Sequence, residues 1–388
     1  MTAGQKTFTA NNAENILMKL FRTTALAAFL AVPAGAQEFV PVNLYVADIV
    51  ESAGTVRIGT PRKLTGDRGV NSQPAFAPDG KSILFVGRRD SANAQSDVYR
   101  IDLETGEESQ ITRTPEMENS PTVTPDGRLM VIRWVPETLF RQGGPWRYDI
   151  QNGVPLDGVL PGPDTVGYYV MVDSVTYAMV RPKSKTTVAI FDTRTKTMTD
   201  RDGPVANLPP QLIPGSRAIS YTRVDSLGRH QITRLEVAGG GGTPIVPALR
   251  DRIVHAWTPS GTILMGRGNR VFARKPGRDS AWKEVAAFVD RELRNVNTYT
   301  VSPDGKKLIM ISPVKPPLQT VLKDALQDGQ SMSQALSGIE DQSVEELRAS
   351  YDISRPGLNG LVAERKRLNQ ADVERLERFV ARVVPPQT

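Results

Sequence analysis

The chain has 388 residues, 39% hydrophobic and 23% charged, and its 32 Gly and 29 Pro are spread along the sequence, which excludes a helical bundle over most of the length. The absence of Cys excludes disulfides and Cys-ligated metals, and two His are too few for a multi-His metal centre. The formal charge of +6 is modest and not concentrated in runs, so nucleic-acid binding is not indicated.

The first predicted element is a secretory signal peptide over residues 18–36. It has a basic start at 18–22, an apolar run at 23–32 and an Ala-Gly-Ala ending before Gln37. The apolar run is about half the roughly 20 residues that a membrane-spanning helix needs. We therefore expect cleavage after Ala36, a periplasmic or secreted mature protein, and no transmembrane segment in it. A buried first helix is the alternative. Residues 1–17 precede the signal and suggest a misassigned start codon.

An internal repeat begins downstream of this segment. The motif Pro-Asp-Gly followed by an apolar strand occurs at Pro78, Pro125 and Pro303. Degenerate copies of it align at Val172, Pro214 and Pro259. The aligned positions are separated by 47, 47, 42, 45 and 44 residues. This spacing is typical of one four-stranded propeller blade.

Each repeat also divides into four expected strands. In the first copy these are 74–77, 82–86, 97–103 and 108–112, joined by turns in which Asp bonds the backbone and Gly tolerates positive φ. Later third strands are expected at 146–150, 188–193, 231–237 and 270–274.

The last repeat lacks its outer two strands, and the missing half lies near the N-terminus. Residues 43–49 match a third strand and 61–65 match a fourth. The prediction is an all-β fold, a six-bladed β-propeller over 43–312 closed by the N-terminal strands, which removes exposed sheet edges.

The repeated Pro-Asp-Gly motif, together with the Asp-Val-Tyr strand at 97–99 and the hairpin at 102–106, resembles the TolB-type, WD-like β-propeller repeat family of exported bacterial proteins. The resemblance covers about 270 residues. It implies an extracytoplasmic propeller that usually recognises a protein and is sometimes a domain of a peptidase or polysaccharide-degrading enzyme, and it implies no reaction.

The C-terminal region, residues 318–384, is predicted to be a small α-helical tail. Apolar residues recur there at helical spacing, and 370–372 is an expected helix start. Residues 351–361 resemble the tetratricopeptide-like helical tails that follow some exported bacterial hydrolases. A helical appendage packed on the propeller or on a partner is the simpler interpretation.

No motif for a reaction is present. The sequence has no Gly-x-Ser-x-Gly elbow, no His-Glu-x-x-His and no phosphate-binding Gly-rich loop. The Asp residues of the Pro-Asp-Gly turns are expected to form turns and not to bind metal. We therefore predict no catalytic residue, no metal ligand and no cofactor.

Candidate binding residues are predicted at the mouth of the channel. Residues just before first strands, and loops that carry aromatic and Arg residues, are typical of recognition rims. His255 is expected to point toward the channel, either as a structural residue or as a ligand or base. The full predicted set is Asn71, Gln73, Arg88, Arg89, Glu118, Asn119, Arg133, Trp134, Phe140, Arg141, Trp146 and His255.

Three functions stay open at this point. The first is a noncatalytic exported propeller that binds a protein partner in the cell envelope through channel-mouth loops. The second is a hydrolase or lyase acting on peptides or acidic glycans in the channel, with carboxylates and His255. The third is a structural member of an envelope complex.

Overall fold

The structure is a computed structural model. It describes residues 41–66, 69–89, 95–134, 143–161, 165–249, 252–288, 293, 295–315, 317–327, 330–337, 339–351, 353 and 368–383. The chain divides into two compact units, Met1–Phe39 and Val40–Thr388, and all the described residues lie in the second. The predicted signal peptide, together with the predicted site residues Phe140 and Arg141, lies outside the described residues.

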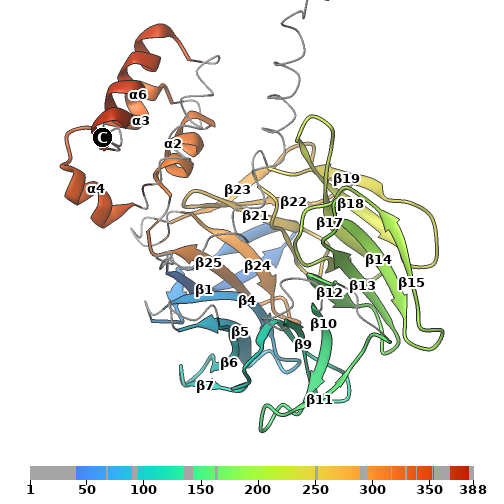
Figure 1. Cartoon of the computed structure of the whole chain (residues 1–388). Helices are drawn as coiled ribbons and strands as arrows, with labels where there is room; N and C mark the ends of the chain where they lie inside the picture. Colours follow the sequence, from blue (N-terminus) through green and yellow to red (C-terminus); the bar gives the residue numbers. More distant parts are fainter. Residues whose placement is uncertain are drawn as a thin grey trace, which may run out of the picture. The chain divides into compact units, whose positions relative to one another are not determined.

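The N-terminal strand pairs with the last strand of the sheet region (Figure 1). Strand β1 (Val42–Ser52) runs antiparallel to β25 (Lys307–Pro313), from the pair Val42 and Pro313 to the pair Asp48 and Lys307. On its other side β1 pairs with β3 (Arg62–Lys63), and it also forms a hairpin with β2 (Thr55–Ile58). Strand β24 (Asn297–Val301) pairs with β25. This arrangement joins segments more than 240 residues apart.

A single parallel pair, Val42 with Val70, continues this sheet into the first repeat. There the strand order is β4 (Val70–Phe76), β5 (Ser82–Arg88), β6 (Asp97–Asp102) and β7 (Glu108–Gln110), each antiparallel to the next. The β1–β4 connection is one residue pair long, whereas β4–β7 are joined by antiparallel ladders of several residue pairs, with a register shift between Ser72 and Ala75 in β4.

Four further sheets of four antiparallel strands follow in chain order. The first consists of β8 (Met117–Val123), β9 (Leu129–Trp134), β10 (Gly143–Tyr148) and β11 (Pro155–Gly158). The second consists of β12 (Tyr168–Met171), β13 (Thr176–Arg181), β14 (Thr187–Asp192) and β15 (Thr197–Asp202). The third consists of β16 (Gln211–Leu212), β17 (Ala218–Val224), β18 (His230–Glu236) and β19 (Thr243–Pro247). The fourth consists of β20 (Ala256–Trp257), β21 (Ile263–Arg267), β22 (Arg270–Arg274) and β23 (Lys283–Ala287).

The second strand of each sheet is buried on both faces, which is why it is a continuous apolar run in the sequence. In β5, residues Ser82 through Gly87 are all buried. Successive side chains point to opposite faces, so Ile83 and Phe85 pack in one cluster while Leu84 packs in another.

Most of the hydrophobic clusters in the β region lie between neighbouring sheets, and one lies between two parts of the nine-stranded sheet. One joins β5 and β6 to β9 and β10, the next joins β9 to β13 and β14, and another joins β13 and β14 to β17 and β18. Further clusters join β18 to β21, then β21 and β22 to β1 and β25. The cluster around Leu44 and Ile309 joins β1 and β25 to β5 and β6. Each described sheet therefore shares apolar side chains with the sheets before and after it.

The Pro-Asp-Gly turns have the predicted chemistry. The Asp79 carboxylate accepts a hydrogen bond from the Lys81 backbone N–H at 2.9 Å, and Gly80 has a φ of +68°. Glycine adopts that conformation without the steric cost that a Cβ imposes.

The helices of the C-terminal region are α2 (Leu318–Gln327), α3 (Met332–Ser337), α4 (Val344–Ser350) and α6 (Gln370–Val383). They bury Leu322, Leu336, Leu376 and Phe379 in a cluster made only of residues from this region. Helix α6 begins in the expected segment 370–372, where the Asn369 side chain accepts a hydrogen bond from the Asp372 backbone N–H at 2.8 Å. Within the described residues, no helix is long and apolar enough to cross a membrane.

Candidate binding site

A cavity of about 310 Å³ lies where the first strands of several sheets approach one another. Its lining comes from β4, β8, β12, β24 and the segment 209–211 at the start of β16. The polar or aromatic side chains of this lining are those of Phe76, Thr122 and Thr300, and five more from Gln73, Ser120, Tyr169, Gln211 and Tyr299. This volume is at the lower end of the range for ligand-binding pockets.

These residues occupy related positions in the sequence repeat. Gln73 and Ser120 lie five residues before Pro78 and Pro125, and Tyr299 lies four before Pro303. Of the five, the sequence analysis selected Gln73 and missed Ser120, Tyr169, Gln211 and Tyr299. The alignment contained the signal, because for five of the six aligned positions, all except Pro259, at least one residue three to five positions earlier lines the cavity.

Gln73 connects the first strands of two neighbouring sheets. Its side-chain oxygen accepts hydrogen bonds from the Ser120 backbone N–H at 2.7 Å and the Ser120 hydroxyl at 2.9 Å. Its amide nitrogen donates to Asn119 Oδ1 at 3.4 Å. Gln73 and Ser120 both have positive φ, +50° and +53°, at equivalent register shifts in β4 and β8. These two predicted site residues, Gln73 and Asn119, are therefore brought together.

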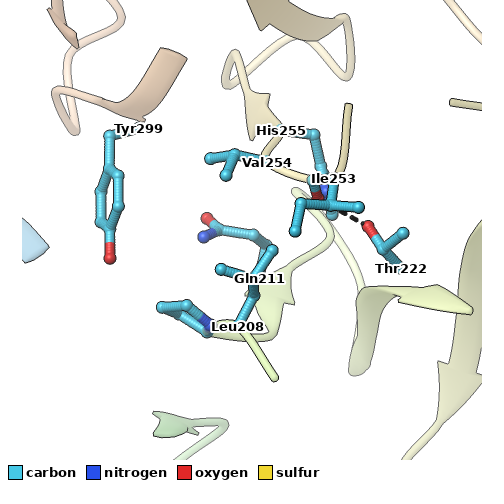
Figure 2. Close-up of a pocket in the computed structure, with 8 residues that line it drawn as sticks. Leu208, Gln211, Thr222, Ile253, Val254, His255 and Tyr299 are labelled. Atoms are coloured by element: carbon cyan, nitrogen blue, oxygen red, sulfur yellow. Dashed lines mark hydrogen bonds between the residues drawn. The ribbon is translucent and has the colours of Figure 1, made fainter. Parts of the chain in front are cut away.

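A second pocket, of about 10 Å³, adjoins the first and contains His255 (Figure 2). The two pockets share Pro209, Gln211 and Tyr299 in their lining. Figure 2 shows Tyr299 facing Gln211 and Val254 across the space. The smaller pocket has room for about one water molecule.

His255 itself is buried, at 4% exposure. Its Nε2 atom lies 2.8 Å from the Ser220 hydroxyl, which also accepts a hydrogen bond from the Trp257 indole N–H at 2.8 Å. Burial lowers the pKa of His255 to about 4, because the charged imidazolium is poorly solvated there. Ser220 is fully buried, so its hydroxyl has no exposed surface, although His255 lines the smaller pocket. No sequence signal marked Ser220.

Glu118 lies away from the cavity lining, fully buried among hydroxyl groups. It accepts hydrogen bonds from Thr112 at 3.1 Å, from Tyr148 at 3.1 Å and from Thr114. Burial raises the pKa of Glu118 to about 7 despite these bonds, and the nearby Asp97 carboxylate adds to the shift. Glu118 joins β8 to β10 and to the connection before β8, which is a structural role.

Asn71 and Arg89 are locked together beside the N-terminal strand. Asn71 is fully buried and donates to the Val42 carbonyl at 2.9 Å, while its Oδ1 accepts from Arg89 at 2.6 Å. The Arg89 guanidinium also pairs with Glu108 at 2.7 Å and stacks on the Tyr99 ring, 4.4 Å from its centroid. Arg88 ends β5, and burial lowers the pKa of its guanidinium.

Arg133, Trp134 and Trp146 lie together in the second repeat. Arg133 pairs with Glu116 and stacks over the Trp146 ring, 4.4 Å from the centroid. A Cβ added at Gly143 would clash with the Trp134 ring, which packs against the cluster between β9 and β13. Both indoles are half-buried structural contacts in this arrangement.

The described residues that line the larger cavity are uncharged. Burial raises the pKa of Tyr299 well above its ordinary value, and neighbouring Tyr168 adds to the shift, so the Tyr299 hydroxyl keeps its proton at neutral pH. Among the described residues, no group of three or more His, Asp or Glu could hold a metal ion. The cavity offers hydroxyls, amides, aromatic rings and prolines, which suit binding by hydrogen bonds and apolar contact.

Comparison with known proteins gives the fold. No protein-family model matches the chain. A protein from Agrobacterium tumefaciens described as TolB has a solved structure that matches with a TM-score of 0.53 at 15% identity, over 70% of this chain and 98% of that chain. The fold is that of a TolB-type β-propeller.

Two further solved structures match with lower TM-scores. TolB from Acinetobacter baumannii matches with a TM-score of 0.42 at 13% identity, over 74% of this chain and 66% of that one. The tricorn protease matches with a TM-score of 0.46 at 18% identity, over 64% of this chain and 27% of that one. The fold assignment rests on the first match alone.

One curated sequence is also similar. An uncharacterized protein of Agrobacterium fabrum is 34% identical over 74 residues, which are 18% of this chain and 22% of that protein. The match therefore spans about a fifth of that relative's length.

Proposed function

We propose that this TolB-type propeller is an exported, noncatalytic, six-bladed ring that binds a protein partner at its central channel. The supporting observation for the ring is the succession of apolar clusters. They run from β1 and β25 through β5, β9, β13, β17 and β21, and then return to β1 and β25. Each of the six groups of strands is thereby packed on both sides, as closure requires.

The cavity lined by first strands is the observation that carries the binding function. Several repeats contribute residues to it, and its volume is about 310 Å³. Its described lining is rich in the aromatic and hydrogen-bonding groups used for recognition. A hydrolase would need an accessible nucleophile and base. The Ser220–His255 pair is the described candidate, and its serine is fully buried. This favours binding over catalysis.

The binding site that we propose differs from the loop residues selected by sequence. Arg89, Arg133 and Trp146 are engaged in ion pairs and ring contacts within their own repeats. Their removal would disturb the scaffold. A blocking substitution inside the cavity is therefore the better test.

The test is affinity capture from native envelope extract with the mature chain, beginning at Gln37, as bait. Ala75 lines the cavity, and Ala75→Trp would fill much of it. Thr199→Trp adds the same indole on the exposed outer strand β15 and is the matched control. We expect one protein retained by the parent and by Thr199→Trp and lost with folded Ala75→Trp. Equal retention by all three would overturn a channel site.

Export is tested on the chain expressed in its host. We expect the mature protein in the extracytoplasmic fraction with Gln37 at its N-terminus, as read by mass spectrometry. Retention in the cytoplasm with residues 18–36 still attached would overturn this part of the proposal.

A further inference from the structure

We infer that the channel cavity selects an uncharged, extended peptide segment, held by the Tyr299 hydroxyl and the Gln211 amide. This inference rests on the proposed channel binding and specifies the chemistry of what enters. It is carried by two properties of the lining, its charge and its unused hydrogen-bonding groups.

The first property is the absence of charge from the described lining. The chain carries 48 Lys and Arg and 42 Asp and Glu, yet all the described residues around the cavity are neutral. A charged side chain that entered would lose its water without gaining a counter-ion, which is strongly unfavourable. A neutral segment avoids that cost. The net positive charge of the chain therefore does not extend into this cavity.

The second property is which polar groups remain available. Gln73 is occupied by Ser120, and the Tyr169 hydroxyl donates to the Met130 carbonyl at 2.9 Å. In the described part of the chain, neither the Gln211 side-chain amide nor the Tyr299 hydroxyl has a hydrogen-bond partner. Both line the space shown in Figure 2. Each is a polar group whose partner would be a ligand.

The donor and acceptor pattern fits a peptide backbone. A glutamine amide offers one acceptor oxygen and two donor hydrogens, and a peptide group offers a donor N–H and an acceptor C=O in return. The remaining walls include five prolines together with Phe76 and the rings of Tyr169 and Tyr299. Walls of aromatic and apolar surface suit an extended, proline-containing segment, whose ordering costs little entropy.

Isothermal titration calorimetry on the full mature chain tests this with defined probes. The neutral probe is the capped peptide acetyl-Gly-Pro-Ser-Pro-Gly-amide, and the charged probes replace its Ser by Glu or by Lys. A neutral oligosaccharide, maltotriose, is the fourth probe. We expect the neutral peptide to bind, both charged peptides to bind at least about tenfold more weakly, and maltotriose not to bind.

Variants assign the contacts. Tyr299→Phe and Gln211→Ala should each weaken the neutral peptide about three- to tenfold, which is the value of one neutral hydrogen bond. Gln151→Ala, on the exposed β10–β11 hairpin, should leave its affinity unchanged. Ala75→Trp should abolish binding. If Ala75→Trp fails to fold, Thr300→Trp, also in the lining, replaces it.

The inference would be overturned if the neutral peptide did not bind, or if it bound no more tightly than the charged peptides. It would also be overturned if Tyr299→Phe and Gln211→Ala left the peptide affinity unchanged, or if maltotriose bound in place of the peptide. The captured envelope protein separates this failure from failure of the proposed function. If Ala75→Trp abolishes capture while neutral peptides do not bind, the channel function stands and the segment chemistry is wrong. If capture survives Ala75→Trp, the channel site itself is wrong.

Discussion

The Gln73 side-chain oxygen accepts two hydrogen bonds from Ser120, one from the backbone N–H at 2.7 Å and one from the hydroxyl at 2.9 Å. The two residues lie 47 positions apart in the sequence, at the same place in successive repeats. Both residues have positive φ and both line the cavity. Strands β4 and β8 therefore each carry one strained backbone position at the cavity wall. This contact fixes the spacing of two adjacent first strands.

Substitution of Gln73 separates the hydrogen bonds from the backbone strain. Gln73→Ala leaves Ser120 without its acceptor and should lower the free energy of unfolding by about 1–3 kcal/mol. Gln73→Gly loses the same bonds but relieves the positive φ, so it should be about 1 kcal/mol more stable than Gln73→Ala. Urea denaturation measures both.

A matched pair elsewhere isolates the strain. Lys196 has a φ of +56° and is exposed in a turn. Lys196→Gly should exceed Lys196→Ala in stability by a similar amount. Equal stability of Gln73→Ala and Gln73→Gly, with a difference at Lys196, would show that the backbone at Gln73 relaxes when its side chain is removed.

Glu118 should make the protein less stable as pH rises. Its folded pKa is about 7, above the ordinary 4.5, so the folded state binds a proton that the unfolded state has released between these values. The free energy of unfolding should therefore fall from about pH 4.5 to about pH 7, by at most about 3 kcal/mol. Glu118→Gln should lack this fall and gain stability over the wild type at pH 8.

Urea midpoints at pH 5 and pH 8 test the Glu118 prediction. Glu104→Gln, a substitution on an exposed hairpin, is the control for loss of a carboxylate. The prediction fails if wild type and Glu118→Gln have parallel pH profiles.

His255 should have the opposite effect. Its folded pKa is about 4, below the ordinary 6.5, so the unfolded state binds a proton that the folded state does not. Its contribution is present above pH 6.5 and is lost as pH falls toward 4. The His255→Asn variant should lose less stability than the wild type between pH 6.5 and pH 4. Thermal unfolding across that pH range measures this, and the Glu118→Gln background removes the opposing pH dependence that Glu118 contributes. A pH profile of stability unchanged by His255→Asn would contradict the burial argument.

The C-terminal helices should loosen independently of the sheets. Leu376 is 1% exposed in a cluster made only of residues from the helical region. Leu376→Ala should cost about 2–5 kcal/mol of local stability. Hydrogen exchange on the full chain should become faster in α2, α3 and α6 and stay unchanged in β5. Arg378→Ala, on the exposed face of α6, should change neither region, and faster exchange in β5 with Leu376→Ala would show that the regions are coupled.

The sequence by itself predicted the β-sheet character, the Asp and Gly turns and the apolar second strands. These features depend on local chemistry, since an Asp caps its own turn and a strand buried on both faces must be apolar throughout. The N-terminal strand was also predicted, since residues 43–49 repeat a local pattern, and β1 does pair with β25.

Only the tertiary structure decided which polar side chains face the cavity and which serve the scaffold. In the sequence, Arg89, Glu118 and Gln73 are all polar residues near strand ends. In the structure Arg89 stacks on Tyr99, Glu118 is enclosed by hydroxyls, and Gln73 lines the cavity. The Tyr299 hydroxyl and the Gln211 side chain, by contrast, line the same pocket. These differences arise from contacts between repeats some 45 residues apart, and local pattern does not encode the direction in which such side chains meet.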